Sequence, residues 1–129
     1  MDLCSEKDIK ALLARHGFRF SRSMGQNFLI DGRVPRAIAE ASGASETAGV
    51  LEIGPGIGPL TVELAKRAAK VAAVELDRTL YPILAETLAP YPNAEVVEGD
   101  AMKLDLAALA AEKFAGLTPI ACANLPYNI

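Results

Sequence analysis

The strongest constraint on the fold is the segment 50–61, which reads Val-Leu-Glu-Ile-Gly-Pro-Gly-Ile-Gly-Pro-Leu-Thr. The apolar run at its start is typical of a buried strand, and three glycines spaced by one residue follow it. Glycine accepts positive φ angles and lets a ligand approach the backbone closely. Pro59 then suits the first turn of a helix. We therefore expect a strand, a tight turn and a helix in succession, with backbone N–H groups around a cavity at the carboxyl end of a parallel sheet.

The spacing of the three glycines limits the ligand of this turn. Gly54, Gly56 and Gly58 form G-x-G-x-G, and Pro59 stands where a dinucleotide-binding turn has its third glycine. A pyrophosphate site needs that glycine for close packing of helix on strand, so a nicotinamide dinucleotide is disfavoured. A wider turn suits a ligand without phosphate, such as S-adenosylmethionine, whose amino-acid end takes backbone hydrogen bonds. A glycine-rich surface turn without a ligand is the alternative.

Short apolar strands alternate with helical segments along the rest of the chain. Expected helices cover residues 5–16, 31–41, 59–65, about 79–88 and 105 to about 115; expected strands cover 50–53, 71–76, 94–97 and 119–123. This alternation predicts an α/β fold with a doubly wound parallel sheet. A chain of 129 residues, 51% of them hydrophobic, is long enough for one domain with a core, and we expect residues 1–48 to form its helical, basic N-terminal extension.

Two helix starts depend on the identity of a capping residue. Asp31 is expected to cap the helix that runs to Ala41. Pro82 is best tolerated in the first turn of the helix that contains it, so Thr79 is a better candidate for its cap than Asp77.

Charge is distributed unevenly along the chain. The formal net charge is −3, but residues 10–36 hold six Lys/Arg against one Asp, whereas residues 37–129 hold six Lys/Arg against twelve Asp/Glu. The basic segment could contact phosphates, although charge alone favours a solvated face without a partner. Cys4 and Cys122 suit reduced thiols. No signal peptide or membrane span is indicated, so we expect a soluble, cytoplasmic protein.

Acidic residues stand where two of the expected strands end. Glu75 follows the first glycine by about twenty residues, which is where an acidic side chain meets the ribose hydroxyls in doubly wound nucleotide sites. An ordinary charge at a strand end is the alternative. Asp100 could accept a hydrogen bond from an adenine amino group, or it could cap the next turn through its carboxylate.

The segment Asn-Leu-Pro-Tyr at 124–127 follows the last expected strand. It resembles the Asn/Asp-Pro-Pro-Tyr motif of methyltransferases that act on amino groups. The lone pair of an adenine N6 is delocalised into the ring, so this nitrogen is a poor nucleophile. Two acceptors, the Asn124 side-chain oxygen and the Leu125 carbonyl, would favour a more tetrahedral nitrogen, and Tyr127 would stack on the extruded base. Positioning and electrostatics would then carry the rate.

Five segments in order resemble the bacterial small-subunit (16S) ribosomal RNA adenine dimethyltransferases, the kasugamycin-sensitivity family. They are Gly-Gln-Asn-Phe-Leu at 25–29, Leu-Glu-Ile-Gly-Pro-Gly-Ile-Gly-Pro-Leu-Thr at 51–61, Val-Glu-Leu-Asp at 74–77, Glu-Gly-Asp-Ala-Met at 98–102 and Asn-Leu-Pro-Tyr-Asn-Ile at 124–129. The resemblance implies a Rossmann-like, S-adenosylmethionine-dependent methyltransferase fold. It also implies transfer of two methyl groups to N6 of each of two adjacent adenosines near the 3′ end of 16S rRNA, by a monomer without metal that acts on the immature small ribosomal subunit.

The resemblance carries roles for individual residues. The cofactor-binding residues that it implies are Asn27, Leu29, Gly54, Gly56, Glu75, Asp100, Ala101 and Asn124. The catalytic motif is Asn124, Leu125, Pro126 and Tyr127. Arg19 and Arg22, in the basic segment, are expected to contact RNA phosphates.

Members of this family continue well beyond the length of this chain. We therefore expect an N-terminal fragment, truncated after the fourth strand, that keeps the cofactor pocket in outline but does not methylate rRNA by itself. Two alternatives are a large-subunit rRNA adenine methyltransferase of the macrolide-resistance type and a non-catalytic module that binds RNA or cofactor. A dehydrogenase is a distant third.

Overall fold

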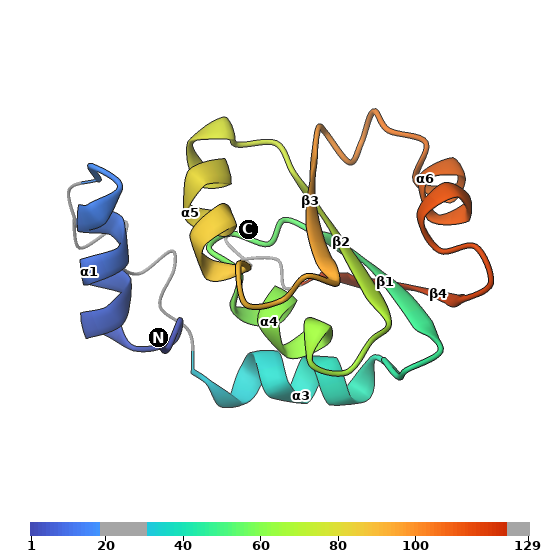
Figure 1. Cartoon of the computed structure of the whole chain (residues 1–129), viewed down its shortest axis with the longest axis horizontal. Coiled ribbons are helices and arrows are strands. Elements are labelled where there is room, and N and C mark those ends of the chain that lie inside the picture. The colour runs from blue at the N-terminus through green and yellow to red at the C-terminus, as the bar shows by residue number, and fades with distance from the viewer. Residues whose placement is uncertain (19–30, 124–129) are drawn as a thin grey trace.

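The computed structural model describes residues 1–18 and 31–123 of the chain, and all that follows on structure concerns these residues. Helices and strands alternate as expected (Figure 1). In chain order the elements are α1 (Glu6–Arg15), α3 (Arg33–Ala41), β1 (Ala48–Ile53), α4 (Pro59–Ala65), β2 (Lys70–Glu75), the 3-10 turn η1 (Arg78–Leu80), α5 (Tyr81–Thr87), β3 (Ala94–Glu98), α6 (Leu106–Lys113) and β4 (Thr118–Ala123). None of the described helices is long and apolar enough to cross a membrane.

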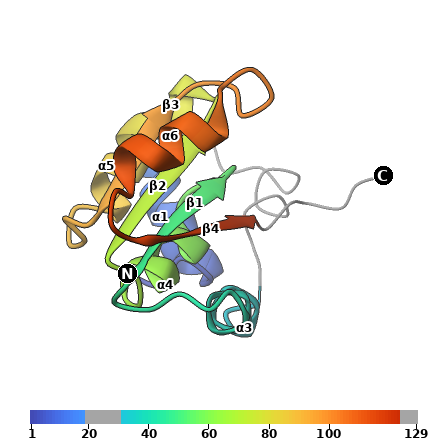
Figure 2. The same cartoon turned by 90° about the vertical axis from the view of Figure 1, so that its right-hand side faces the viewer.

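The four strands form one parallel sheet in the order β3-β2-β1-β4. The chain first winds outwards from β1 through β2 to β3, then crosses back over the sheet to place β4 on the other side of β1. Helix α6 makes that crossing on one face of the sheet, and α4 and α5 lie on the opposite face (Figures 1 and 2). This confirms the doubly wound parallel sheet, whose strand order reverses between β1 and β4.

Alternation along the strands supplies both layers of the core. Val50 on β1 and Val71 on β2 pack against α3 and α4, whereas Leu51 and Val74 pack against α6 and its neighbour Phe114. Because successive side chains of a strand point to opposite faces, one apolar run serves two helical layers. This is why β1 and β2 are almost entirely buried.

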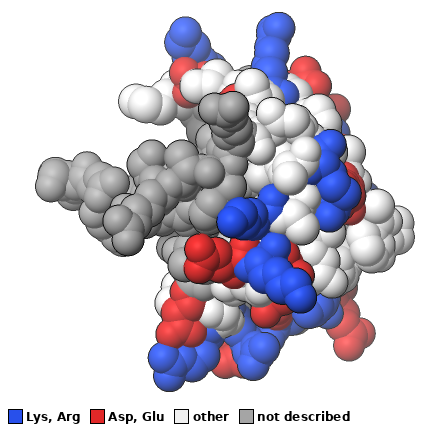
Figure 3. All heavy atoms as spheres, turned by 90° about the vertical axis from the view of Figure 1, so that its left-hand side faces the viewer, with Lys and Arg blue, Asp and Glu red and all other residues white. Residues whose placement is uncertain are grey.

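Helix α1 packs on α5 at the side of the domain (Figure 1). Leu12 and Leu13 join the apolar cluster of α5, and Arg15 and His16 both contact Glu86, the imidazole Nε2 at 3.0 Å from Oε1. The hydrogen bond from Arg15 lowers the pKa of Glu86. Figure 3, viewed from this side, shows basic and acidic side chains interspersed on the described surface rather than one continuous basic patch.

The capping expectations were correct in one respect and wrong in two. Thr79 does not cap its helix: the Asp77 carboxylate accepts the Thr79 N–H at 3.0 Å and opens η1, and α5 follows with Pro82 in its first turn as expected. The 3-10 turn η1 comes before Pro82, and the N–H groups at the start of a helical turn have no partner within it. Asp77 accepts one of these, the N–H of Thr79. Asp31 accepts the Arg33 N–H at 2.9 Å, but the N-cap of α3 is Gly32.

Some element boundaries also shift by a few residues. Strand β1 begins at Ala48, two residues before the expected start at residue 50, because Ala48 continues the pairing with β4. Helix α6 ends at Lys113 rather than near residue 115. The side chain of the next residue, Phe114, turns into the core instead, and Gly116 closes the segment at a φ of +80°.

Candidate functional site

The carboxyl ends of all four strands meet at one edge of the sheet. Ile53 on β1 is in register with Val74 on β2 and with Ala123 on β4, and Glu75 on β2 is in register with Glu98 on β3. The segments that leave the sheet here therefore start side by side. This edge contains the point where the strand order reverses, which is where ligands bind in open α/β sheets.

The glycine turn between β1 and α4 occupies the centre of this edge. Gly54, Gly56 and Gly58 have φ angles of +70°, +61° and +104°, which side chains rarely adopt. The N–H of Gly54 donates to the carbonyl of Val74 at 3.0 Å, and the N–H of Gly58 donates to Pro55 at 3.0 Å. Two anchors therefore hold the backbone of the turn in place.

The same turn leaves room and donors for a ligand. The N–H groups of Gly56 and Ile57 donate to no acceptor among the described residues. A Cβ atom at Gly54 would meet no atom of the described residues within 4 Å, so the positive φ, and not crowding, requires glycine there. The turn thus combines open space at Gly54 with a free backbone donor at Gly56, and its role toward the amino-acid end of S-adenosylmethionine stays a prediction.

Glu75 ends β2 at this edge and is almost buried. Its Oε2 accepts the Asp77 N–H at 3.0 Å, and its backbone carbonyl accepts the Tyr81 hydroxyl at 2.7 Å and the Gly99 N–H at 3.1 Å. These contacts fix the carboxylate at the strand end. The other carboxylate oxygen, Oε1, has no hydrogen-bond partner among the described residues and is available to a hydroxyl donor.

Asp100 lies just beyond the end of β3, and Ala101 follows it. The Asp100 Oδ1 accepts the Met102 N–H at 2.9 Å, so the expected turn-capping role of this carboxylate is confirmed. The second oxygen has no partner in the described part of the chain. The role toward an adenine amino group stays a prediction.

Two large apolar side chains at this edge were missed from sequence. Leu76, directly after Glu75, is 64% exposed, and Met102, shortly after Asp100, is 95% exposed. Both side chains flank predicted cofactor residues, Leu76 next to Glu75 and Met102 next to Ala101. The signal was available: each follows an acidic residue at or just beyond the end of a strand.

Glu52 was also missed, and it is the one acidic side chain of β1. It is 1% exposed, and the Thr61 hydroxyl on α4 donates to its Oε1. Burial raises the pKa of Glu52 to about 7; the hydrogen bond from Thr61 opposes the rise and the charge of Glu75 adds to it. An acidic residue inside an apolar strand was the sequence signal for a buried carboxyl.

The structure brings together the five described residues of the predicted cofactor site, which are Gly54, Gly56, Glu75, Asp100 and Ala101. The other predicted site residues, Arg19, Arg22, Asn27, Leu29, Asn124, Leu125, Pro126 and Tyr127, lie outside the described residues. Strand β4 ends at Ala123, the residue before Asn124 in the chain, at the edge that carries the glycine turn.

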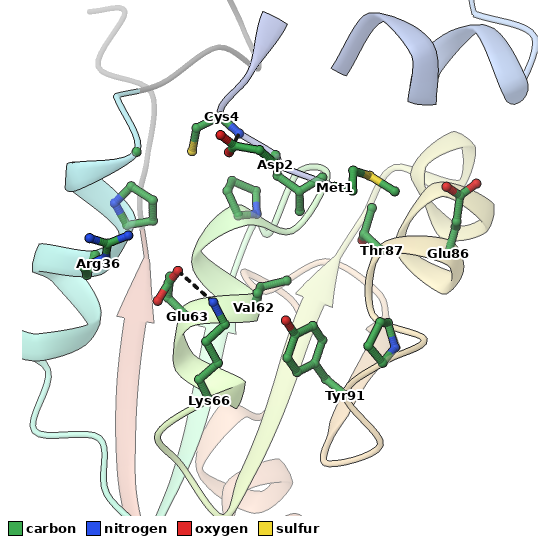
Figure 4. A pocket seen from close by; sticks show the side chains of 15 residues that line it. Met1, Asp2, Cys4, Arg36, Val62, Glu63, Lys66, Glu86, Thr87 and Tyr91 are labelled. Atoms are coloured by element: carbon green, nitrogen blue, oxygen red, sulfur yellow. Dashed lines mark hydrogen bonds and ion pairs between the residues drawn. The ribbon is translucent and has the colours of Figure 1, made fainter. Parts of the chain in front are cut away.

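A cavity of about 430 Å³ lies elsewhere, among the N-terminal segment, the start of α3, α4 and the end of α5 (Figure 4). Arg36, Glu63, Lys66 and Tyr91 line it, with the Lys66 ammonium 3.4 Å from the Glu63 carboxylate. None of the five described site residues lines this cavity. We therefore assign the candidate site to the edge of the sheet and not to this cavity.

Comparisons with known proteins agree with this fold. The family described as Ribosomal RNA adenine dimethylase matches residues 17–129. The ribosomal RNA small subunit methyltransferase A of Geobacillus thermodenitrificans is 49% identical over 129 residues, which are 99% of this chain and 44% of that protein. The chain thus spans less than half the length of the curated relatives that it matches.

Two solved structures are similar in fold and sequence. A dimethyladenosine transferase from Plasmodium falciparum has a TM-score of 0.60 and 32% identity, over 77% of this chain and 34% of that one. The 23S rRNA methyltransferase ErmE has a TM-score of 0.55 and 41% identity, over 58% of this chain and 31% of that one.

Proposed function

The chain belongs to the Ribosomal RNA adenine dimethylase family, and from that premise we propose that its site serves methyl transfer from S-adenosylmethionine to N6 of adenosines near the 3′ end of small-subunit rRNA. The observation that carries the proposal is the shared edge. The glycine turn, Glu75, Asp100 and the end of β4 all lie where the carboxyl ends of the strands meet. The substrate would be the immature small ribosomal subunit in the cytoplasm.

We propose that the edge of the sheet binds the cofactor along its length. The free N–H group of Gly56 suits the amino-acid end, and the unpaired oxygen of Glu75 suits the ribose hydroxyls. Leu76 and Met102 offer exposed apolar surface for the adenine ring, with Asp100 beside them. Bound there, S-adenosylmethionine would supply an electrophilic methyl group.

The residues beyond β4 would prepare the acceptor. The Asn124 side-chain oxygen and the Leu125 carbonyl would accept hydrogen bonds from the adenine amino group, and Tyr127 would stack on the base. Asn27 and Leu29 would complete the cofactor pocket. Two points support these roles: the family pattern, and the fact that β4 ends at Ala123, directly before Asn124, at the edge that carries the glycine turn.

A large-subunit rRNA target is the second candidate, favoured by the 41% identity to the 23S rRNA methyltransferase ErmE. The curated relatives that match over nearly the whole chain, at up to 49% identity, are small-subunit enzymes, so we prefer the small subunit. Disruption of the gene separates the two: a kasugamycin phenotype supports the small-subunit target. Macrolide resistance on expression supports the other.

Cofactor binding can be measured directly on the 129-residue chain. We expect S-adenosylhomocysteine to bind in isothermal titration calorimetry, and Glu75→Gln to weaken binding about tenfold because the ribose hydroxyls lose a charged acceptor. Glu98→Gln is the matched control, since Glu98 is in register with Glu75 on the next strand and is exposed. A wild-type chain that binds no S-adenosylhomocysteine would contradict the proposed cofactor site.

A further inference from the structure

A buried hydrogen bond closes the base of the glycine turn. Thr61 Oγ1 on α4 donates to Glu52 Oε1 on β1, and neither side chain is accessible to solvent beyond 1%. Glu52 stands two residues before Gly54, and Thr61 stands three residues after Gly58. The two side chains therefore connect the strand that enters the turn to the helix that leaves it.

The other contacts of the turn do not make this connection. Gly54 is anchored to β2 through Val74, and Gly58 is bonded to Pro55 within the turn. Among hydrogen bonds between described residues, the contact from Thr61 to Glu52 is the one that joins β1 to α4. The separation of the two ends of the turn thus depends on these two side chains and on the apolar packing around them.

We infer that Glu52 and Thr61 are positioning residues, which hold the N–H groups of the glycine turn in the arrangement that binds the amino-acid end of the cofactor. Without their hydrogen bond the turn populates other arrangements. The apparent affinity of a ligand falls in proportion to the fraction of molecules that keep the competent one. This inference rests on the proposed function, because it assumes that the turn binds the cofactor.

The test distinguishes the effect of the Thr61 hydroxyl on cofactor binding from the effect of the size of the side chain. Thr61→Val keeps the shape and removes the donor, whereas Thr61→Ser keeps the donor and removes a buried methyl group. S-adenosylhomocysteine is titrated calorimetrically into each 129-residue variant well below its melting temperature. We expect Thr61→Val to bind about tenfold more weakly than wild type and Thr61→Ser to bind within about twofold of it, even though the serine variant also melts earlier.

Thr87→Val is the matched control. Thr87 is also buried, and a Cβ atom at Gly58 would lie 3.1 Å from its hydroxyl, but that hydroxyl donates to Leu84 within its own helix. We expect this variant to bind like wild type. If Thr61→Val and wild type bind with equal affinity, the inference is overturned. It is also overturned if Thr61→Val and Thr61→Ser weaken binding equally, because a merely structural role of Thr61 would give that result.

The same contact can be tested from its other side if Thr61→Val does not fold. Glu52→Gln keeps an acceptor for the Thr61 hydroxyl and should bind S-adenosylhomocysteine like wild type. Glu52→Met is similar in length without the acceptor and should bind about tenfold more weakly. Equal affinities of these two variants would overturn the inference, whereas a wild-type chain without affinity would overturn the proposed function and the inference with it.

Discussion

Gly49→Ala should abolish cooperative folding of the chain or lower its free energy of unfolding by at least about 3 kcal/mol, the upper part of the range for overpacked cores. A Cβ atom at Gly49 would lie 2.3 and 2.4 Å from two ring carbons of Phe114 and 2.8 Å from its Cβ. Phe114 is 3% exposed and packs in one cluster with side chains of β1, β2 and α6, so moving its ring would disturb the packing of that cluster. The measurement is urea unfolding followed by circular dichroism.

Gly32→Ala is the matched control for this prediction. Gly32 has a φ of −59°, and a Cβ atom there would meet nothing closer than 3.6 Å, at Cys4. We expect a change below about 1 kcal/mol. A double-mutant cycle tests the mechanism, because the loss caused by Gly49→Ala should shrink in a Phe114→Ala background. The same loss in both backgrounds would show that the ring of Phe114 is not responsible.

Gly49 also illustrates which part of the fold sequence reasoning cannot reach. The order of helices and strands followed from apolar periodicity and from the glycine and proline stops, and the structure confirms it. Gly49, however, was left outside the expected strand 50–53, since a glycine in a loop and a glycine under an aromatic ring look alike in sequence. Its partner, Phe114, is distant in the chain and becomes a neighbour only after α6 has crossed the sheet.

The position of the candidate site could also be predicted from sequence, but its buried side-chain contacts could not. Glu75 was predicted from its spacing after the first glycine, and Asp100 from its place beyond a strand end. The structure places both at this edge because parallel strands bring their carboxyl ends together, and their roles toward the cofactor stay predictions. Glu52 was missed because its role depends on side-chain packing: only the seating of α4 on β1 places Thr61 over it. Patterns along the chain predict which edge an acidic residue reaches, but not which neighbour removes it from water.

Wild-type stability should fall by about 2 to 3 kcal/mol between about pH 5 and pH 8 through Glu52 alone. Burial raises the pKa of Glu52 from 4.5 in its ordinary state to about 7 in the folded chain. Below the ordinary value the carboxyl is protonated in both states and costs nothing. As pH rises, the unfolded chain releases the proton first, so the folded state is penalised, and the penalty is complete once the folded carboxyl has also ionised above about pH 7.

Glu52→Gln isolates this effect because its amide does not titrate. Interactions with basic side chains lower the pKa of Glu63 and of Glu86, which gives stability that is lost as pH falls, but both remain in wild type and variant and cancel in the difference. Urea unfolding should therefore show Glu52→Gln gaining about 2 to 3 kcal/mol on wild type between pH 5 and pH 8. Glu46→Gln, at an exposed position, should show no such gain. A wild-type chain and a Glu52→Gln variant with parallel pH profiles would mean that the Glu52 carboxyl ionises as readily in the folded chain as in water, against its burial beneath α4.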